Sequence, residues 1–277
     1  MKSSGLVNRS LFVLFLLIFT SALFAQQVND RNYKPQVGQE GKDVVWVPTP
    51  QELVDKMLEL AGVTSEDYVI DLGSGDGRTV ISAAKLGARA LGIEYNPDMV
   101  ELSKRNAEKQ GVGDKARFIC ADLFESDFSE ATVVTMFLLK DINMRLRPRI
   151  LDLKPGTRIV SNTFDMGEWE ADQKVKLDKN RHTWNTALLW IVPAKIEGTW
   201  KMKNGELTFR QEFQVVYGSL TIGDNSYDIS GGKLNGNEII FTVNGEIYKG
   251  RVSGNKMKGT VTTGVNVSNW NASRGKS

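Results

Sequence analysis

The chain has 277 residues, of which 41% are apolar and 25% charged, a composition typical of globular proteins that excludes disordered and fibrous ones. Lysine and arginine total 35 against 33 for aspartate and glutamate, so the basic excess typical of nucleic-acid-binding proteins is absent and no such partner is expected. One cysteine, Cys120, and one histidine, His182, exclude an intrachain disulfide and make a metal site unexpected. The length predicts two domains, or one domain with a large appendage.

The first 25 residues have the pattern of a secretory signal peptide. Lys2 and Arg9 precede an apolar run over residues 11–19, and small residues lead to Ala25. The run is shorter than the roughly 20 residues that a membrane-spanning helix needs. We expect cleavage after Ala25 and an exported protein, periplasmic or membrane-associated, with an uncleaved membrane anchor as the alternative. Residues 26–45 are polar and lack periodicity, which predicts a linker or arm.

Residues 46–194 alternate between helical and strand patterns. Helices are predicted over residues 50–60, 78–86, 97–110 and 143–153. Strands are predicted over residues 68–72, 90–94, 117–120, 132–139 and 158–161. This alternation is typical of a doubly wound, Rossmann-like α/β fold, a parallel sheet with helices on both faces. Two further strand patterns, residues 174–177 and 186–192, flank a polar turn and predict an antiparallel hairpin that completes a seven-strand sheet.

The composition changes at residue 195. Residues 195–277 contain 13 of the 26 glycines and three Asn-Gly pairs, which begin at Asn204, Asn235 and Asn244. Asn-Gly between short alternating runs is a strong hairpin signal, because both residues tolerate the positive φ of a type I′ turn. We therefore predict a separate small antiparallel β domain, a barrel or a sandwich. Its core is expected to contain its aromatic residues, including Trp200, Phe209, Phe213 and Trp270, with a ligand- or protein-binding face as the alternative. Cys120, in an apolar strand pattern, is expected in the core of the first domain.

A glycine-rich turn follows the first of these strands. Residues 71–77 read DLGSGDG, and Glu94 ends the second strand. Glycines let the backbone approach a ligand at the carboxyl end of a strand, where the Glu94 carboxylate can accept both hydroxyls of a ribose. Dinucleotide-binding turns share this pattern, but they have Gly or Ala at the position of Arg78, and the carboxylates of Asp71 and Asp76 would repel a pyrophosphate. S-adenosylmethionine (SAM) has a ribose, a cationic centre and no phosphate, and therefore fits better.

The sequence resembles the class I, seven-strand SAM-dependent methyltransferases over residues 42–194. Residues 71–77 match their first motif, Glu94 matches their ribose-binding residue, and residues 121–123 match their adenine-contacting motif. The resemblance implies SAM as the cofactor. The cofactor-binding residues expected from the turn and the resemblance together are Thr49, Asp71, Gly73, Gly75, Asp76, Gly77, Glu94 and Asp122. Thr49, Asp76 and Asp122 are also explained as helix caps.

A narrower resemblance is to the lysine N-methyltransferases that act on mitochondrial membrane proteins. It rests on the segments VPTP at residues 47–50, GIEYNP at 92–97 and GTRIVS at 156–161, and on Trp169. It implies a protein lysine as methyl acceptor. The apolar N-terminal segment, which those enzymes share, is compatible with a position near a membrane.

The strand pattern at residues 132–139 is not followed by the Asn/Asp-Pro-Pro-Tyr/Phe motif of the methyltransferases that modify exocyclic amines. Its absence argues against DNA or adenine-type acceptors. Two other functions stay open: an exported binding protein on a methyltransferase scaffold without turnover, and a small-molecule or lipid methyltransferase at a membrane. No catalytic base and no oligomeric state follow from the sequence.

Overall fold

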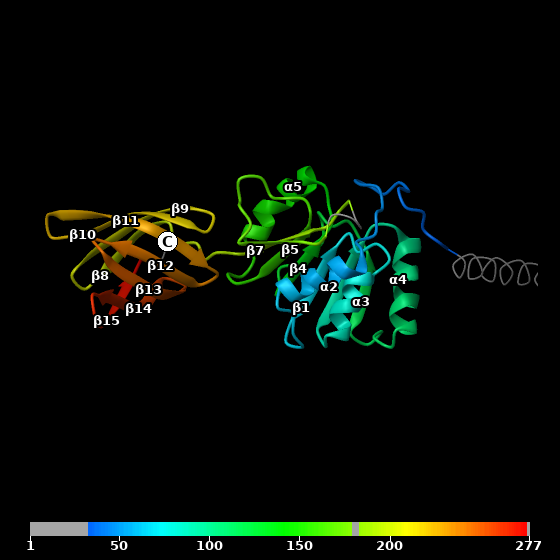
Figure 1. The fold of residues 1–277 in the computed structure, drawn as a ribbon, viewed down its shortest axis with the longest axis horizontal. Helices are drawn as coiled ribbons and strands as arrows, with labels where there is room; N and C mark the ends of the chain where they lie inside the picture. Colours follow the sequence, from blue (N-terminus) through cyan, green and yellow to red (C-terminus); the bar gives the residue numbers. More distant parts are fainter. Residues whose placement is uncertain (1–32, 179–182, 276–277) are drawn as a thin grey trace, which may run out of the picture.

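The structure is a computed structural model that describes residues 33–178 and 183–275. The predicted signal peptide and His182 lie outside these ranges. Figure 1 shows two bodies along the long axis of the molecule, an α/β body and a β-barrel. Within the described ranges, no helix is both long and apolar enough to cross a membrane.

Seven strands form the sheet of the α/β body, and they are β1 (Tyr68–Leu72), β2 (Arg89–Glu94), β3 (Ala116–Cys120), β4 (Val133–Met136), β5 (Arg158–Asn162), β6 (Gln173–Lys176) and β7 (Thr186–Ile191). Their order is β3-β2-β1-β4-β5-β7-β6, and β1 to β5 are parallel. Strand β7 pairs antiparallel with β5 and β6, which confirms the predicted hairpin. Cys120 is exposed, and its prediction as a core residue is wrong, because β3 is an edge strand.

Four described helices cover the two faces of the sheet, and they are α2 (Gln51–Leu60), α3 (Arg78–Lys85), α4 (Pro97–Lys109) and α5 (Lys140–Leu151). Helices α2, α3 and α4 share one apolar cluster with Val69 and Val133, whereas α5 shares a second cluster with Ile70 and Val134. Neighbouring residues of a strand therefore face opposite layers, as the pleat requires. The strand predicted over residues 132–139 ends at Met136, because the chain turns there into α5.

The second body is a closed antiparallel barrel. Of the two predicted architectures, a barrel and a sandwich, the barrel is the one that forms. Its strands are β8 (Gly198–Met202), β9 (Gly205–Glu212), β10 (Val215–Ile222), β11 (Asn225–Asn235), β12 (Glu238–Val243), β13 (Glu246–Ser253), β14 (Lys256–Thr263) and β15 (Asn266–Ser273). Trp200, Phe209 and Trp270 are buried in its interior as predicted. All three Asn-Gly pairs lie at hairpin turns. Only in the pair Asn244 and Gly245 do both residues have a positive φ, 47° and 79°.

Phe213 lies outside the barrel core, contrary to the prediction, and packs on the α/β body. Its ring stacks on the buried Trp169 with centroids 5.8 Å apart and an interplanar angle of 12°. The Arg147 guanidinium lies 5.3 Å from the same ring centroid. Beside it, Gln214 Nε2 donates a hydrogen bond of 2.9 Å to the carbonyl of Glu170. The turn between β9 and β10 thus docks the barrel on the first body.

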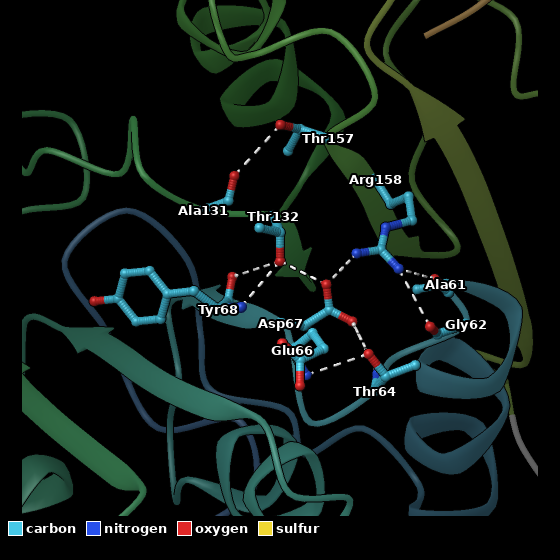
Figure 2. A network of polar contacts seen from close by, with 10 residues as sticks. All are labelled: Ala61, Gly62, Thr64, Glu66, Asp67, Tyr68, Ala131, Thr132, Thr157 and Arg158. Atoms are coloured by element: carbon cyan, nitrogen blue, oxygen red, sulfur yellow. Dashed lines mark hydrogen bonds and ion pairs between the residues drawn. The ribbon is translucent and has the colours of Figure 1, made fainter.

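A polar network joins the amino ends of β1, β4 and β5 (Figure 2). The buried Asp67 carboxylate accepts hydrogen bonds from Thr132 Oγ1 at 2.7 Å and from the Thr64 backbone N–H at 2.8 Å, and it forms an ion pair with Arg158. Arg158 also donates to the carbonyl of Ala61, just past α2. Burial alone would raise the pKa of Asp67, but the bonds from Thr132, Thr64 and Arg158 together lower it.

We expect the Asp67→Ala variant to lose about 2–3 kcal/mol in free energy of unfolding at pH 7, because Arg158 and Thr132 lose a shared charged acceptor. Urea denaturation followed by circular dichroism measures this. A lowered carboxyl pKa stabilises the fold above the ordinary value of about 3.9, and the contribution disappears as the pH falls through the lowered value. The difference between wild type and variant should therefore shrink in acid. A difference under about 0.5 kcal/mol at pH 7 would contradict the role of Asp67.

Candidate active site

A crevice opens at the carboxyl ends of β1, β2 and β4, where the strand order reverses direction. Its walls include the loop after β1, the ends of β2 and β3, and the turn after β4, and residues 39–49 of the N-terminal arm cover it. Seven of the eight expected cofactor residues line the crevice, and they are Thr49, Asp71, Gly73, Gly75, Asp76, Glu94 and Asp122. Gly77 does not line it.

The loop between β1 and α3 needs its glycines for different reasons. Gly73, Gly75 and Gly77 have φ values of 77°, 54° and 82°, in the left-handed region that favours glycine. A Cβ on Gly75 would lie 2.6 Å from Trp46 Nε1, on the crevice side. A Cβ on Gly77 would lie 2.8 Å from the Phe118 ring, on the side packed against the body. Gly77 therefore allows the loop to pack against the body of the domain, on the side away from the crevice.

Glu94 is held at the rim of the crevice by backbone amides. One carboxylate oxygen accepts from the Gly75 N–H and the other from the Asn96 N–H, each at 2.9 Å. An ionised carboxylate has about four acceptor positions, so about two remain for the hydroxyls of a ligand. This arrangement presents Glu94 in one fixed orientation next to the glycine loop.

Asp71 is buried at the end of β1, with 6% of its surface exposed. Burial, together with the charges of Glu94 and Asp76, raises its pKa to about 7, although a 2.6 Å hydrogen bond from Thr135 Oγ1 opposes the rise. A cation bound in the crevice would offset this cost by stabilising the ionised carboxylate.

Arg78 joins the glycine loop to the arm. It donates to both oxygens of Asp76, from Nε at 2.9 Å and from Nη2 at 2.6 Å, and from Nη1 to the Thr49 carbonyl at 2.8 Å. Thr49 is buried and does not cap α2, because Pro50 is the N-cap residue of that helix. The Thr49 hydroxyl accepts a hydrogen bond from Asn162 Nδ2 at 3.3 Å. Asn162, at the end of β5, carries no sequence signal for this contact.

The arm closes the crevice through Lys42 and Trp46. Lys42 forms an ion pair with Asp122, and its Nζ lies 4.8 Å from the Tyr95 ring centroid. The hydrogen bond from Lys42 is the main cause that lowers the pKa of Asp122, and the hydrogen bond from the Phe124 backbone N–H lowers it further. The cavity that remains measures about 110 Å³, whereas ligand sites usually measure about 300–1,000 Å³. A nucleoside ligand therefore requires an outward movement of the arm.

Three half-buried aromatic rings meet beside the crevice. Phe137 lines it after β4, Phe164 follows β5 and Trp184 precedes β7. The ring centroids of Phe137 and Phe164 are 6.1 Å apart, and those of Phe164 and Trp184 are 5.2 Å apart. The buried Asn143 positions Phe164 by donating from Nδ2 to its carbonyl at 3.1 Å. Sequence reasoning missed this cluster because its members come from three separate segments.

The donor set of the crevice fits SAM. Glu94 offers fixed acceptors for ribose hydroxyls, and Asp71 offers a buried carboxylate for a cationic group. Arg78 and Lys42, the two cations among its described lining residues, are already paired with Asp76 and Asp122, which leaves no cation for a phosphate. The site therefore favours a cationic nucleoside over a dinucleotide.

We expect the affinity for SAM to rise with pH through the pKa of Asp71. With a pKa of about 7, this carboxyl is mostly neutral at pH 6 and mostly ionised at pH 8. The dissociation constant from calorimetric titration should fall about tenfold between these values. Asp71→Asn should bind SAM more weakly at pH 8, by about 1–3 kcal/mol, and lose this pH dependence.

The same substitution gives an internal control. Because a raised carboxyl pKa costs stability above the unfolded value of about 3.9, Asp71→Asn should unfold at a higher temperature than wild type at pH 8. Weaker binding by a more stable variant excludes misfolding as the cause. A wild-type dissociation constant that stays flat from pH 6 to pH 8 would remove Asp71 from the binding site.

Lys42→Ala is expected to bind SAM more tightly than wild type, because the arm then opens at lower cost. Because exposed ion pairs contribute little, the gain should be modest, about fivefold in affinity at most. Lys34→Ala is the matched control, since Lys34 lies on the same arm but does not line the crevice. Weaker binding by Lys42→Ala would show instead that Lys42 contributes to the cofactor site.

Comparisons with known proteins agree with this geometry. The sequence model of the ANTKMT methyltransferase domain matches residues 71–173 and stops before the barrel begins. A protein-lysine N-methyltransferase of Saccharolobus islandicus is 42% identical over 152 residues, which cover 54% of this chain and 94% of that protein. The adenine nucleotide translocase lysine N-methyltransferase of Mus musculus is 33% identical over 104 residues, 37% of this chain and 45% of that enzyme.

A solved structure shows the same fold with a cofactor product bound. An RNA methyltransferase from Salinibacter ruber, in complex with S-adenosyl-L-homocysteine, is 49% identical, with a TM-score of 0.51 over 54% of this chain and 96% of that one. Relatives, sheet order and the glycine loop lead to one conclusion. The chain belongs to the class I, seven-strand SAM-dependent methyltransferases, in the branch that contains the protein-lysine N-methyltransferases and the ANTKMT domain.

Proposed function

We propose that this methyltransferase transfers the methyl group of SAM to the ε-amino group of lysine in a protein. The observation that carries this proposal is the 42% identity to the Saccharolobus protein-lysine N-methyltransferase, of which the chain covers 94%. The Mus musculus relative, of which it covers 45%, also has a protein lysine as its named target.

In this proposal the crevice holds SAM through side chains and backbone of its own loops. Glu94 accepts the ribose hydroxyls, Asp71 faces the cationic part, and Asp122 becomes free for the adenine when Lys42 withdraws. When bound, SAM supplies an electrophilic methyl group attached to a good leaving group. The residues of the chain then act mainly by positioning the two reactants and excluding water, which supplies most of the acceleration in such transfers.

The acceptor amine has to be neutral before it can attack. The ordinary pKa of lysine is about 10.4, and an apolar environment lowers it by disfavouring the ammonium form. The rings of Phe137, Phe164 and Trp184 form such a wall at the mouth of the crevice. We propose that the lysine side chain enters along this wall, with its methylene groups against the rings.

The test uses the chain starting at Gln26 and SAM labelled in its methyl group. Cell protein, RNA and lipid are supplied as separate acceptors, and the labelled fraction is hydrolysed and analysed for methyllysine by mass spectrometry. We expect label in protein, as methyllysine, and none with the Glu94→Ala variant. Label in RNA, the acceptor named for the Salinibacter relative, or in lipid would overturn the lysine proposal. SAM binding without any labelled product would favour a scaffold without turnover.

We propose further that the protein is exported. The pattern of residues 1–25 supports this, since a basic start, a short apolar run and a small-residue exit precede the polar arm. Cell fractionation followed by N-terminal sequencing tests it, and a mature chain that begins at Gln26 in the exported fraction is the expected result. A chain that keeps Met1 in the membrane fraction would indicate an anchor, whereas a cytoplasmic chain would refute export.

A further inference from the structure

A second concavity lies between the barrel and the edge of the sheet. It encloses about 670 Å³. Asp172, Gln173 and Ile191 contribute from the α/β body, and strands β11 to β14 contribute the rest. We call this concavity the basic groove, because its barrel wall presents four exposed cations, which are Lys233, Lys249, Arg251 and Lys258.

The charges in the basic groove are only partly balanced. Lys233 pairs with Asp172 at 3.3 Å, and Arg251 pairs with Glu238 at 2.8 Å. Lys249 and Lys258 form no ion pair with any described residue, although Lys258 lies directly opposite Arg251 in the register of β13 and β14. The groove therefore has an excess of positive charge that an anionic partner would balance.

Strand β6 leads from the basic groove to the active site. It is the last strand of the sheet, so its outer edge offers backbone N–H and C=O groups that pair with no other described strand. Gln173 lines the groove at one end of the strand, and Lys176 pairs with Thr186 at the other. Thr186 lies two residues after Trp184, one of the three rings beside the crevice.

We propose that the basic groove and the outer edge of β6 hold an extended acidic segment of the acceptor protein. This inference rests on the proposed lysine methylation and deepens it. Carboxylates of the segment pair with Lys249 and Lys258, and its main chain adds to β6 as a further strand. Strand β6 takes up four residues of the segment at about 3.3 Å each, and the acidic residues lie beyond it, roughly five to ten positions from the lysine.

Two observations favour a polypeptide over a nucleic acid. No aromatic side chain is among the described residues lining the basic groove, whereas single-stranded nucleic acids usually stack their bases on aromatic rings. The free edge of β6 matches the hydrogen-bonding pattern of a peptide main chain, which a sugar-phosphate backbone lacks.

The experiment compares two peptides that each contain one lysine. The first has four glutamates five to ten residues from the lysine, and the second has glutamines at those positions. Binding is followed by fluorescence anisotropy and methyl transfer by kcat and KM, with the chain starting at Gln26. We expect wild type to bind the acidic peptide about tenfold more tightly than the neutral one and to methylate it with a correspondingly lower KM.

The variant that tests the groove carries both Lys249→Glu and Lys258→Glu, which reverse the charge of the two lysines that form no ion pair with a described residue. It should lose the preference for the acidic peptide while its kcat and its affinity for SAM stay unchanged. The matched control is Lys201→Glu with Lys203→Glu, since these exposed lysines belong to the barrel but do not line the groove. An acidic peptide with alternate backbone amides methylated should also bind more weakly, because it cannot pair with β6.

Each outcome separates the groove from the lysine proposal. Groove-dependent binding of the acidic peptide without methylation would support the groove and overturn the lysine acceptor. Methylation and binding that are equal in wild type and the groove variant would overturn the groove and leave the lysine acceptor standing. Binding of polyuridine that depends on Lys249 and Lys258, with no preference for the acidic peptide, would replace the proposal by a nucleic-acid surface.

Discussion

Clustered carboxylates are the constraint on which the active site depends. Several carboxylates gather at the carboxyl ends of β1, β2 and β3, and most are balanced by the chain itself: Glu94 by two backbone amides, Asp76 by Arg78 and Asp122 by Lys42. Asp71 accepts from Thr135 but has no cation beside it among the described residues, and its pKa rises to about 7. The crevice is therefore built to receive positive charge, which explains why a sulfonium nucleoside suits it better than a pyrophosphate.

The two ends of β1 show how the surroundings decide the role of one residue type. Asp67 and Asp71 are both buried and lie four positions apart. Asp67, at the amino end, has Arg158 beside it, and its pKa is lowered, so it stabilises the fold. Asp71, at the carboxyl end, has a raised pKa and costs stability until a cation arrives. The aspartate at the amino end of β1 thus contributes to stability, and the aspartate at the carboxyl end contributes to ligand binding.

In the proposed docking of an acceptor, the barrel extends the binding surface, and none of its described residues line the cofactor crevice. Phe213 stacks on Trp169 and holds the barrel against the last strands of the sheet, on the side where the basic groove and the free edge of β6 lie. In the functions proposed above, the arm controls access of the cofactor, and the barrel widens the route by which a protein acceptor reaches the three rings beside the crevice. The arm is held over the crevice by the ion pair of Lys42 with Asp122 and by the hydrogen bond from Arg78 to the Thr49 carbonyl.

The sequence by itself determined the alternation of strands and helices, the glycine loop and Glu94, because each depends on residues that are neighbours along the chain or on the regular pairing of parallel strands. Predictions from the sequence were wrong where long-range packing determines the position of a residue. The apolar run after Met136 leaves the sheet, Phe213 leaves the barrel core, and Cys120 is exposed at a sheet edge. Closure of the barrel, the contact of Lys42 with Asp122 and the three-ring cluster were decided by tertiary structure alone, since each joins segments far apart in sequence that no local pattern connects.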